Sequence, residues 1–280
     1  TYLDAQDDDD SSAGGQGVLT LNQFRLGAQD GNIAMRVADM VVLPRAINRN
    51  EWLHYYEWSV KQWGAIQPPA FATAGTGSNS TTSPTPDYPA NVSGQQFWMQ
   101  VTTLGLTSAP STPAGWSLIY GPDTTGTIRQ YVYSRDARAT GSDSGTVTVT
   151  IAAGNSTNMA RIYAISGVTA SVTSNGYAEN ETTTASTDGT CPGPTVAPKG
   201  YGRLAVAFVS VNDDSGMGVI TGATGGTWGE AVAEHTSGLG AGMQLQIARL
   251  PNPAPISGGT ATVGQAGRNV ICRAFALVGL

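Results

Sequence analysis

The chain repeats one of its own segments near its end. Residues Ala160–Gly167 return as Cys272–Gly279, with an Arg at the second position of each copy, at a spacing of 112 residues (272 − 160 = 112). Trp116 and Trp228 each follow a Gly-containing turn at the same spacing (228 − 116 = 112). Two matches at one spacing indicate an internal duplication, which restricts the fold to one that can be built twice.

Shorter matches lie between these two. Residues 144–149 correspond to 258–263, and residues 128–133 correspond to 243–248. The loops between the matched segments differ in length and in chemistry. The copies therefore share strands and core, and they give no sign of a common catalytic centre.

The matched segments have the periodicity of strands. Residues 146–151 and 243–247 alternate between apolar and polar side chains, which predicts strands with one buried face in an antiparallel sheet. Residues 204–209 are continuously apolar, which predicts a central strand covered on both faces. No helix of useful length is predicted after the first quarter of the chain.

These observations predict an all-β fold of duplicated antiparallel β-sandwich or jelly-roll units, with one short helix near the N-terminus. We place the repeats at 65–168 and 169–280. The two repeats either stack as separate units or form one pseudo-symmetric domain over 65–280. Residues 1–64 form a separate segment.

The first segment begins with clustered aspartates at 7–10, which are typical of a solvated stretch. Strands are predicted near 18–26 and 38–43. A helix is predicted at Glu51–Trp63, with Asn50 as its N-cap and Gly64 as its C-cap. Its aromatic residues recur at helical spacing, which favours packing against a neighbouring surface over a ligand platform.

Composition excludes several partners. Charged residues make up 12% of the chain, about half the usual fraction, and Ser and Thr supply most of the polarity in the loops. The net charge is −6, and the 14 Lys and Arg are scattered, so the sequence predicts no nucleic-acid partner and no attraction to an anionic membrane. No apolar run is long enough to span a membrane.

Side chains that could carry catalysis are sparse. Glu230, Glu234 and His235 lie close together, and Glu179 and Glu181 form a second acidic group; both are predicted in loops. Facing carboxylates could hydrolyse a glycoside, but acidic residues in loops are usually only solvated. The sequence therefore predicts no enzyme and no cofactor, and a depolymerase would require two carboxylates that face each other in a groove.

The remaining candidates are the two cysteines and the two histidines. They are too far apart in sequence for a zinc site, so no metal is predicted. Cys272 is interpreted as a small core residue, because free cysteine is often buried. A Cys191–Cys272 disulfide is the alternative, and it would imply an oxidising compartment.

The first segment resembles the C-terminal end of a concanavalin A-like lectin/glucanase domain of the LamG type. The resemblance rests on Phe24-Arg25-Leu26-Gly27, Gly31-Asn32-Ile33, the strand at 37–43, Arg45-Ala46 and the helix that ends at Trp63-Gly64. It covers about the first quarter of the chain. The sugar and calcium loops of that family lie upstream of this part, so no binding residue is carried over.

Residues 70–280 resemble β-rich modules of phage virion proteins, such as tail fibres, head fibres and decorations. The resemblance rests on Pro113-Ala114-Gly115-Trp116, the strand at 128–133, the Ser-Gly-Thr-Val-Thr-Val run at 144–149 and the final strand of the module at 160–168. It implies a structural protein on the outer surface of a virion, whose partners are other virion proteins and copies of itself. A host-surface glycan is a further candidate partner. A carbohydrate-binding adhesin or a subunit of a bacterial extracellular filament is the alternative, which an exposed aromatic platform would favour.

Overall fold

The structure is a computed structural model that describes residues 68–105, 109–151, 157–168, 178–199, 202–214, 216–236, 240–251, 254–262 and 266–279. These residues lie in one compact unit that spans Arg45–Leu280. They form an all-β structure, as the sequence predicts, and the described ranges contain no helix. The helix predicted at Glu51–Trp63 and the lectin-like strands of 1–64 lie outside the described residues.

The first repeat forms a six-stranded antiparallel sheet. Its strands are β1 (Ala70–Ala74), β2 (Ser78–Ser80), β3 (Gln96–Leu104), β4 (Trp116–Thr125), β5 (Ile128–Arg135) and β6 (Thr157–Ser166). Their order is β1-β6-β3-β5-β4, and β2 pairs with β6 along the same edge as β1. The segment 75–89 is thus partly loop and partly edge strand.

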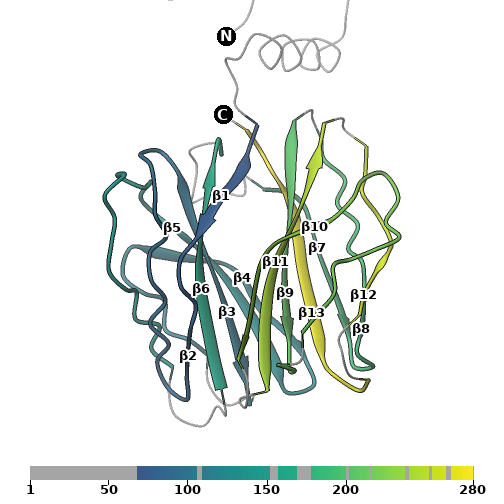
Figure 1. Cartoon of the computed structure of the whole chain (residues 1–280), viewed down its shortest axis with the longest axis horizontal. Helices are drawn as coiled ribbons and strands as arrows, with labels where there is room; N and C mark the ends of the chain where they lie inside the picture. Colours follow the sequence, from purple (N-terminus) through teal and green to yellow (C-terminus); the bar gives the residue numbers. More distant parts are fainter. Residues whose placement is uncertain are drawn as a thin grey trace, which may run out of the picture. The chain divides into compact units, whose positions relative to one another are not determined.

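The second repeat forms a five-stranded antiparallel sheet in the corresponding order (Figure 1). Its strands are β7 (Ala178–Ser186), β9 (Arg203–Val211), β10 (Gly229–Thr236), β11 (Ala241–Leu250) and β13 (Val270–Leu277), and a separate small sheet pairs β8 (Thr190–Pro192) with β12 (Thr260–Thr262). The order β7-β13-β9-β11-β10 matches β1-β6-β3-β5-β4 strand for strand. The predicted duplication is therefore confirmed at the level of topology.

The two matched tryptophans occupy equivalent buried positions. Trp116 opens β4 with 4% of its surface exposed, and Trp228 immediately precedes β10 with 2% exposed. Each packs in the outer core of its own repeat, between the large sheet and the segments that cover it. The shared spacing therefore reports a shared packing position.

The register corrects one of the shorter matches. The residue of β3 that faces Ala160 also faces Tyr131, and the residue of β9 that faces Cys272 also faces Gln244. Tyr131 is thus equivalent to Gln244, whereas the sequence match pairs it with Gln246. A shift of two residues keeps every side chain on its face of the sheet, so the periodicity could not reveal it.

The two large sheets pack face to face and share a central core. Its rings come from both repeats: Trp98 and Tyr120 lie 5.4 Å and 5.0 Å from Phe275, and Tyr163 lies 5.8 Å from Phe208 between ring centroids. All five side chains belong to one buried cluster. Each sheet needs the other to bury this apolar face away from water.

Outer segments cover the other face of each large sheet, and this explains a second correction. The predicted polar face of β11 carries Gln244 and Gln246, and neither side chain is exposed. The backbone N–H of Ile220 in the outer layer donates to Gln246 Oε1 at 2.9 Å. β11 is therefore buried on both faces, whereas β9 is covered on both faces as predicted.

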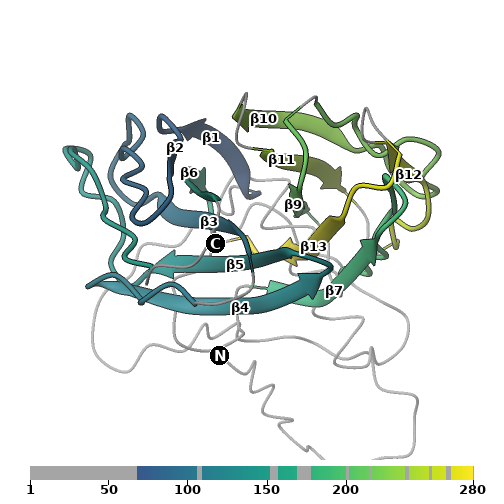
Figure 2. The ribbon, with the colours of Figure 1, turned by 90° about the horizontal axis from the view of Figure 1, so that it is seen from below.

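Equivalent arginines join the two repeats in both directions. Arg273 on β13 donates two hydrogen bonds to the Asp123 carboxylate on β4, at 2.9 Å and 2.6 Å. Arg161 on β6 donates to the backbone O of Ala233 on β10 at 3.2 Å. Figure 2 shows β4 reaching across to β7 and β13, and the Cα atoms of these strands approach within 8 Å. The contact between the repeats therefore has approximate two-fold symmetry.

Candidate binding surface on the outer layer of the first repeat

The outer layer of the first repeat presents a row of threonines. Along residues 146–151, Val147, Val149 and Ile151 are buried while the three threonines between them are exposed. Backbone N–H groups of Val147 and Val149 donate to Pro86 and Pro84, each at 3.0 Å, which fixes the segment against its neighbour. The alternation predicts the buried face correctly, and the same alternation creates the hydroxyl face. The predicted strand is wrong, because residues 146–151 form only isolated bridges, at Thr146 with Asp87 and at Ile151 with Pro110.

A groove lies beside this row. It encloses about 440 Å³ and is lined by Tyr88, Thr112, Pro113, Ala114, Trp116, Thr146, Val147, Thr148 and Thr150. None of these side chains is charged, and the threonine hydroxyls can both donate and accept hydrogen bonds. The groove is chemically suited to a neutral, hydroxyl-rich ligand.

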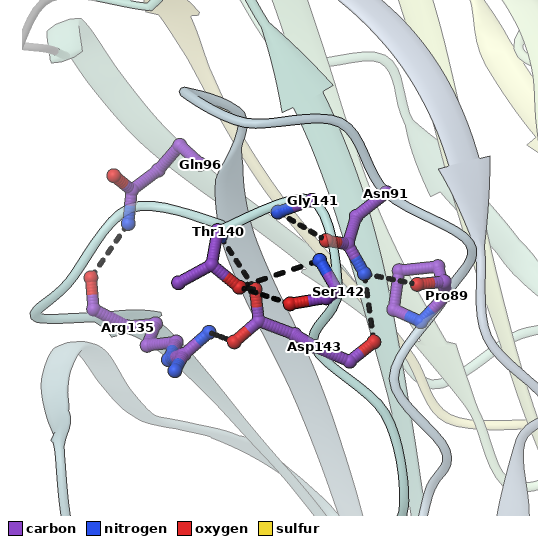
Figure 3. Close-up of polar contacts among 8 residues, drawn as sticks. All are labelled: Pro89, Asn91, Gln96, Arg135, Thr140, Gly141, Ser142 and Asp143. Atoms are coloured by element: carbon purple, nitrogen blue, oxygen red, sulfur yellow. Dashed lines mark hydrogen bonds and ion pairs between the residues drawn. The ribbon is translucent and has the colours of Figure 1, made fainter.

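An ion pair between Arg135 and Asp143 lies beside the aromatic edge of the groove, and Figure 3 shows the pair with its hydrogen-bonded loop. The Arg135 guanidinium lies 5.2 Å from the ring centroid of Tyr88 and 5.5 Å from that of Phe97. It also contacts Asp143, with 2.6 Å between Nη1 and Oδ1. Arg135 is therefore held between two rings and a carboxylate, and it fixes the position of Tyr88.

The loop that carries Asp143 is closed by its own hydrogen bonds. The backbone N–H and hydroxyl of Thr140 donate to Asp143 Oδ2 at 2.6 Å and 2.9 Å. Asn91 Nδ2 donates to the Asp143 backbone O at 2.9 Å, and Asn91 Oδ1 accepts from the Gly141 N–H at 3.0 Å. Partial burial acts to raise the pKa of Asp143, but the hydrogen bonds from Thr140 and Arg135 outweigh it, so the pKa lies below its usual value.

The aromatic residues near the groove serve packing. Tyr88 stacks on Trp116 at 6.3 Å between centroids and contacts Phe97 at 5.2 Å, so its faces are largely occupied. Every aromatic residue within the described ranges is buried or half-buried. The exposed aromatic platform that would favour an adhesin is therefore absent from the part of the chain that the structure describes.

The acidic residues considered for catalysis lie in strands, which corrects their prediction as loop residues. Glu230, Glu234 and His235 belong to β10, and Glu179 and Glu181 belong to β7. These strands form opposite edges of one sheet with three strands between them, so their backbones lie roughly 19 Å apart. Facing carboxylates that cleave a glycoside are separated by about 5–9.5 Å, so the two groups cannot form such a pair.

Glu230 instead has a structural contact. Its Oε2 accepts a hydrogen bond of 2.7 Å from Gln244 Nε2. Both cysteines are buried free thiols, and Cys191 lies in β8. The described residues contain no group of three or more side chains that could hold a metal ion. His54 lies outside the described ranges.

Sequence reasoning did not predict the cluster of Asn91, Arg135 and Asp143. No motif connects these residues, and their association depends on loops that meet only in the folded chain. No helix in the described part of the chain is long and apolar enough to cross a membrane. No family model, no curated protein and no solved structure matches the chain.

Proposed function

We propose that this chain is a non-enzymatic structural protein on the outer surface of a phage particle, either a capsid decoration or a fibre component. The main support for a structural role is the way in which the two repeats are joined. Two repeats are fused through a common core, and the buried polar side chains between them hydrogen-bond to one another. Gln100 and Gln130, for example, both donate to Ser210 across the central interface. The location on a virion rests on the resemblance of residues 70–280 to virion modules.

The edge strands of the two large sheets are poorly suited to pairing with a strand of another chain. The pairings of β1, β4, β7 and β10 each contain a register shift, and β4 also contains Pro122. Bulges and prolines interrupt the row of free N–H and C=O groups that a second sheet would need. Partners would bind the loops, the outer layers or residues 1–67.

The surface is suited to an exposed position on a particle. Few charges and many hydroxyls give little attraction to nucleic acid or to anionic surfaces. The only large hydrophobic side chains exposed in the described ranges are Val92 and Leu118. They leave no broad apolar patch for non-specific association.

Quantitative mass spectrometry of purified, salt-washed particles tests this proposal. We expect peptides from the chain to remain with the particles and antibodies against residues 68–280 to bind intact particles. A high copy number would identify a capsid decoration, and a low one a fibre component. Absence of the chain from washed particles would overturn the virion role.

The threonine-lined groove favours one additional role, which is contact with a host-surface glycan. Thr146→Val removes a hydroxyl from the groove without changing the shape of the side chain. The matched control is Thr260→Val, because Thr260 is exposed at the equivalent position of the second repeat (260 − 146 = 114, the spacing of the 144–149 match). On an array of neutral oligosaccharides, Thr146→Val should weaken binding and Thr260→Val should not. Equal binding by both variants, or no binding by the unmodified chain, would exclude the groove as a glycan site.

A further inference from the structure

The chain has two cysteines, and the fold brings them into one core. Cys191 is the central residue of β8 and faces Ala261 on β12. Cys272 lies on β13 in the large sheet. Both belong to the same buried cluster, with 1% and 0% of their surfaces exposed. A residue of the small outer sheet and a residue of the large sheet thus point into the same space.

Thr184 on β7 lies beside both cysteines. The Thr184 hydroxyl lies 3.5 Å from Cys191 Sγ, and the Thr184 backbone O lies 3.8 Å from the same sulfur. Thr184 is also the residue that pairs with Cys272 in the register of β13 with β7, so their side chains are neighbours on one face of the sheet. Cα atoms of β8 and β13 approach within 8 Å. Cys191 contacts Thr184 and Cys272 is its cross-strand neighbour, so both thiols lie in the same part of the buried cluster.

The duplication gives an independent reason to treat the cysteines as a pair. Cys272 is equivalent to Ala160, and Cys191 is equivalent to Pro86, because Pro86 accepts from Val147 as Cys191 pairs with Ala261. The second repeat has cysteine at both positions, and the first repeat has it at neither. A core that needed only a small apolar residue would not require the two to occur together.

We propose that Cys191 and Cys272 form a disulfide when the chain folds, or opens locally at β8, in the presence of a small-molecule disulfide such as oxidised glutathione. The bond would fasten the small outer sheet of β8 and β12 to the large sheet of the second repeat. The thiolate of Cys191 attacks the oxidant, forms a mixed disulfide and releases one glutathione thiol. The thiolate of Cys272 then attacks the Cys191 sulfur, closes the bond and releases the second glutathione thiol, so two protein thiols are oxidised and one small disulfide is reduced.

Burial decides when this reaction takes place. It raises the pKa of the Cys191 thiol and raises the pKa of Cys272 well above its ordinary value, so little of either thiolate exists in the closed fold. Reaction therefore requires β8 to open, or it occurs before the core has closed. Chain made in a reducing cytoplasm keeps both thiols, and chain that opens or refolds in an oxidising medium becomes cross-linked.

The experiment compares the full chain refolded from denaturant in a glutathione redox buffer with the full chain refolded in excess dithiothreitol. We expect the first sample to contain no disulfide-linked dimer, to be 2 Da lighter in intact mass and to contain no free thiol under denaturing conditions, whereas the reduced sample contains two. The bond closes a loop of roughly 80 residues, so the oxidised chain should melt roughly 10 °C higher than the reduced chain.

Cys272→Ala and Cys191→Ala serve as controls, and alanine is the residue at the position equivalent to Cys272 in the first repeat. Neither variant should change its melting temperature between the two buffers. Two free thiols after oxidative refolding would overturn the proposal, as would a disulfide-linked dimer or an oxidised chain that melts no higher than the reduced one. These outcomes can be read from the unmodified chain even if a variant fails to fold.

Discussion

Truncation of Phe208 to alanine tests whether the two repeats depend on one central core. Phe208 lies on β9 with no exposed surface, and its ring centroid is 6.4 Å, 5.8 Å and 5.8 Å from those of Trp98, Tyr163 and Phe275. Trp98 and Tyr163 belong to the first repeat, and Phe275 belongs to the second. Removal of a buried phenylalanine ring costs roughly 3–5 kcal/mol through lost burial and the cavity that remains.

The expected result is one cooperative transition at a lower temperature, because the cavity opens between the sheets and destabilises both. For a unit of this size, a loss of about 4 kcal/mol lowers the melting temperature by roughly 8–16 °C. Leu118→Ala is a suitable control because 42% of Leu118 is exposed on edge strand β4. It should change stability by less than about 1 kcal/mol.

Calorimetry and urea unfolding, followed by tryptophan fluorescence and far-ultraviolet circular dichroism, provide the measurement. The fluorescence sums all six tryptophans, among them Trp116 and Trp228 in the two outer cores and Trp98 in the central core. Both probes should shift together in Phe208→Ala, and a single transition should remain. Two transitions, of which Phe208→Ala moves only one, would refute the view that the sheets share one core.

Three further changes probe local contacts. Gly225→Ala should cost roughly 1–3 kcal/mol, because φ is +85° and a Cβ would lie 2.0 Å from the backbone O of Pro255; Gly145→Ala, with φ of +82° and open space, is the control for backbone strain alone, and equal melting temperatures would contradict the contact. Asp143→Asn should remove part of the loss of stability in acid. The pKa of Asp143 is lowered in the folded chain, so its contribution is complete above the unfolded pKa of about 4 and disappears as the pH falls through the folded pKa. Urea midpoints from pH 7 to pH 3 check this, and parallel pH profiles would contradict it. Asp123→Asn should cost roughly 1–3 kcal/mol by urea unfolding, because its arginine partner is only 15% exposed and would lose a bidentate ion pair; an unchanged midpoint would show that the pair contributes nothing.

The sequence predicts the strand content and the duplication because both leave local or repeated signals. The apolar run at 204–209 predicts the central strand β9, and the matched tryptophans predict equivalent buried positions. The alternation at 146–151 predicts which side chains are buried. Each of these inferences needs only the spacing of residues along the chain.

The burial of β11 could not be predicted in this way. In the sequence, Gln244 and Gln246 are typical of the solvent-exposed face of a strand. They are buried only because the outer layer covers them. Their amides are satisfied there, since Gln246 Nε2 donates to Gln244 Oε1 at 2.6 Å and to Gly218 O at 3.3 Å. Periodicity shows that one face of a strand is polar. It does not show whether another segment covers that face and hydrogen-bonds to its side chains.

The groove and its supporting cluster were unpredictable for the same reason. Asn91 and Asp143 are 52 residues apart, and Arg135 at the end of β5 contacts Tyr88 in the loop before β3. None of these residues stands in a recognisable motif. The alternation at 146–151 identifies the buried valines and the exposed threonines, but it carries no sign of the groove beside them.

The pseudo-symmetry of the central contact limits how the chain can associate with copies of itself. Arg161 and Arg273 are equivalent, and each reaches an edge strand of the other repeat, β10 or β4. This is the reciprocal geometry of an isologous contact, in which two copies of one surface bind each other. In the fused chain that surface is already filled by its own second copy and is buried. Association with further copies must therefore use other surfaces, and the loops are where the two repeats differ in length and chemistry.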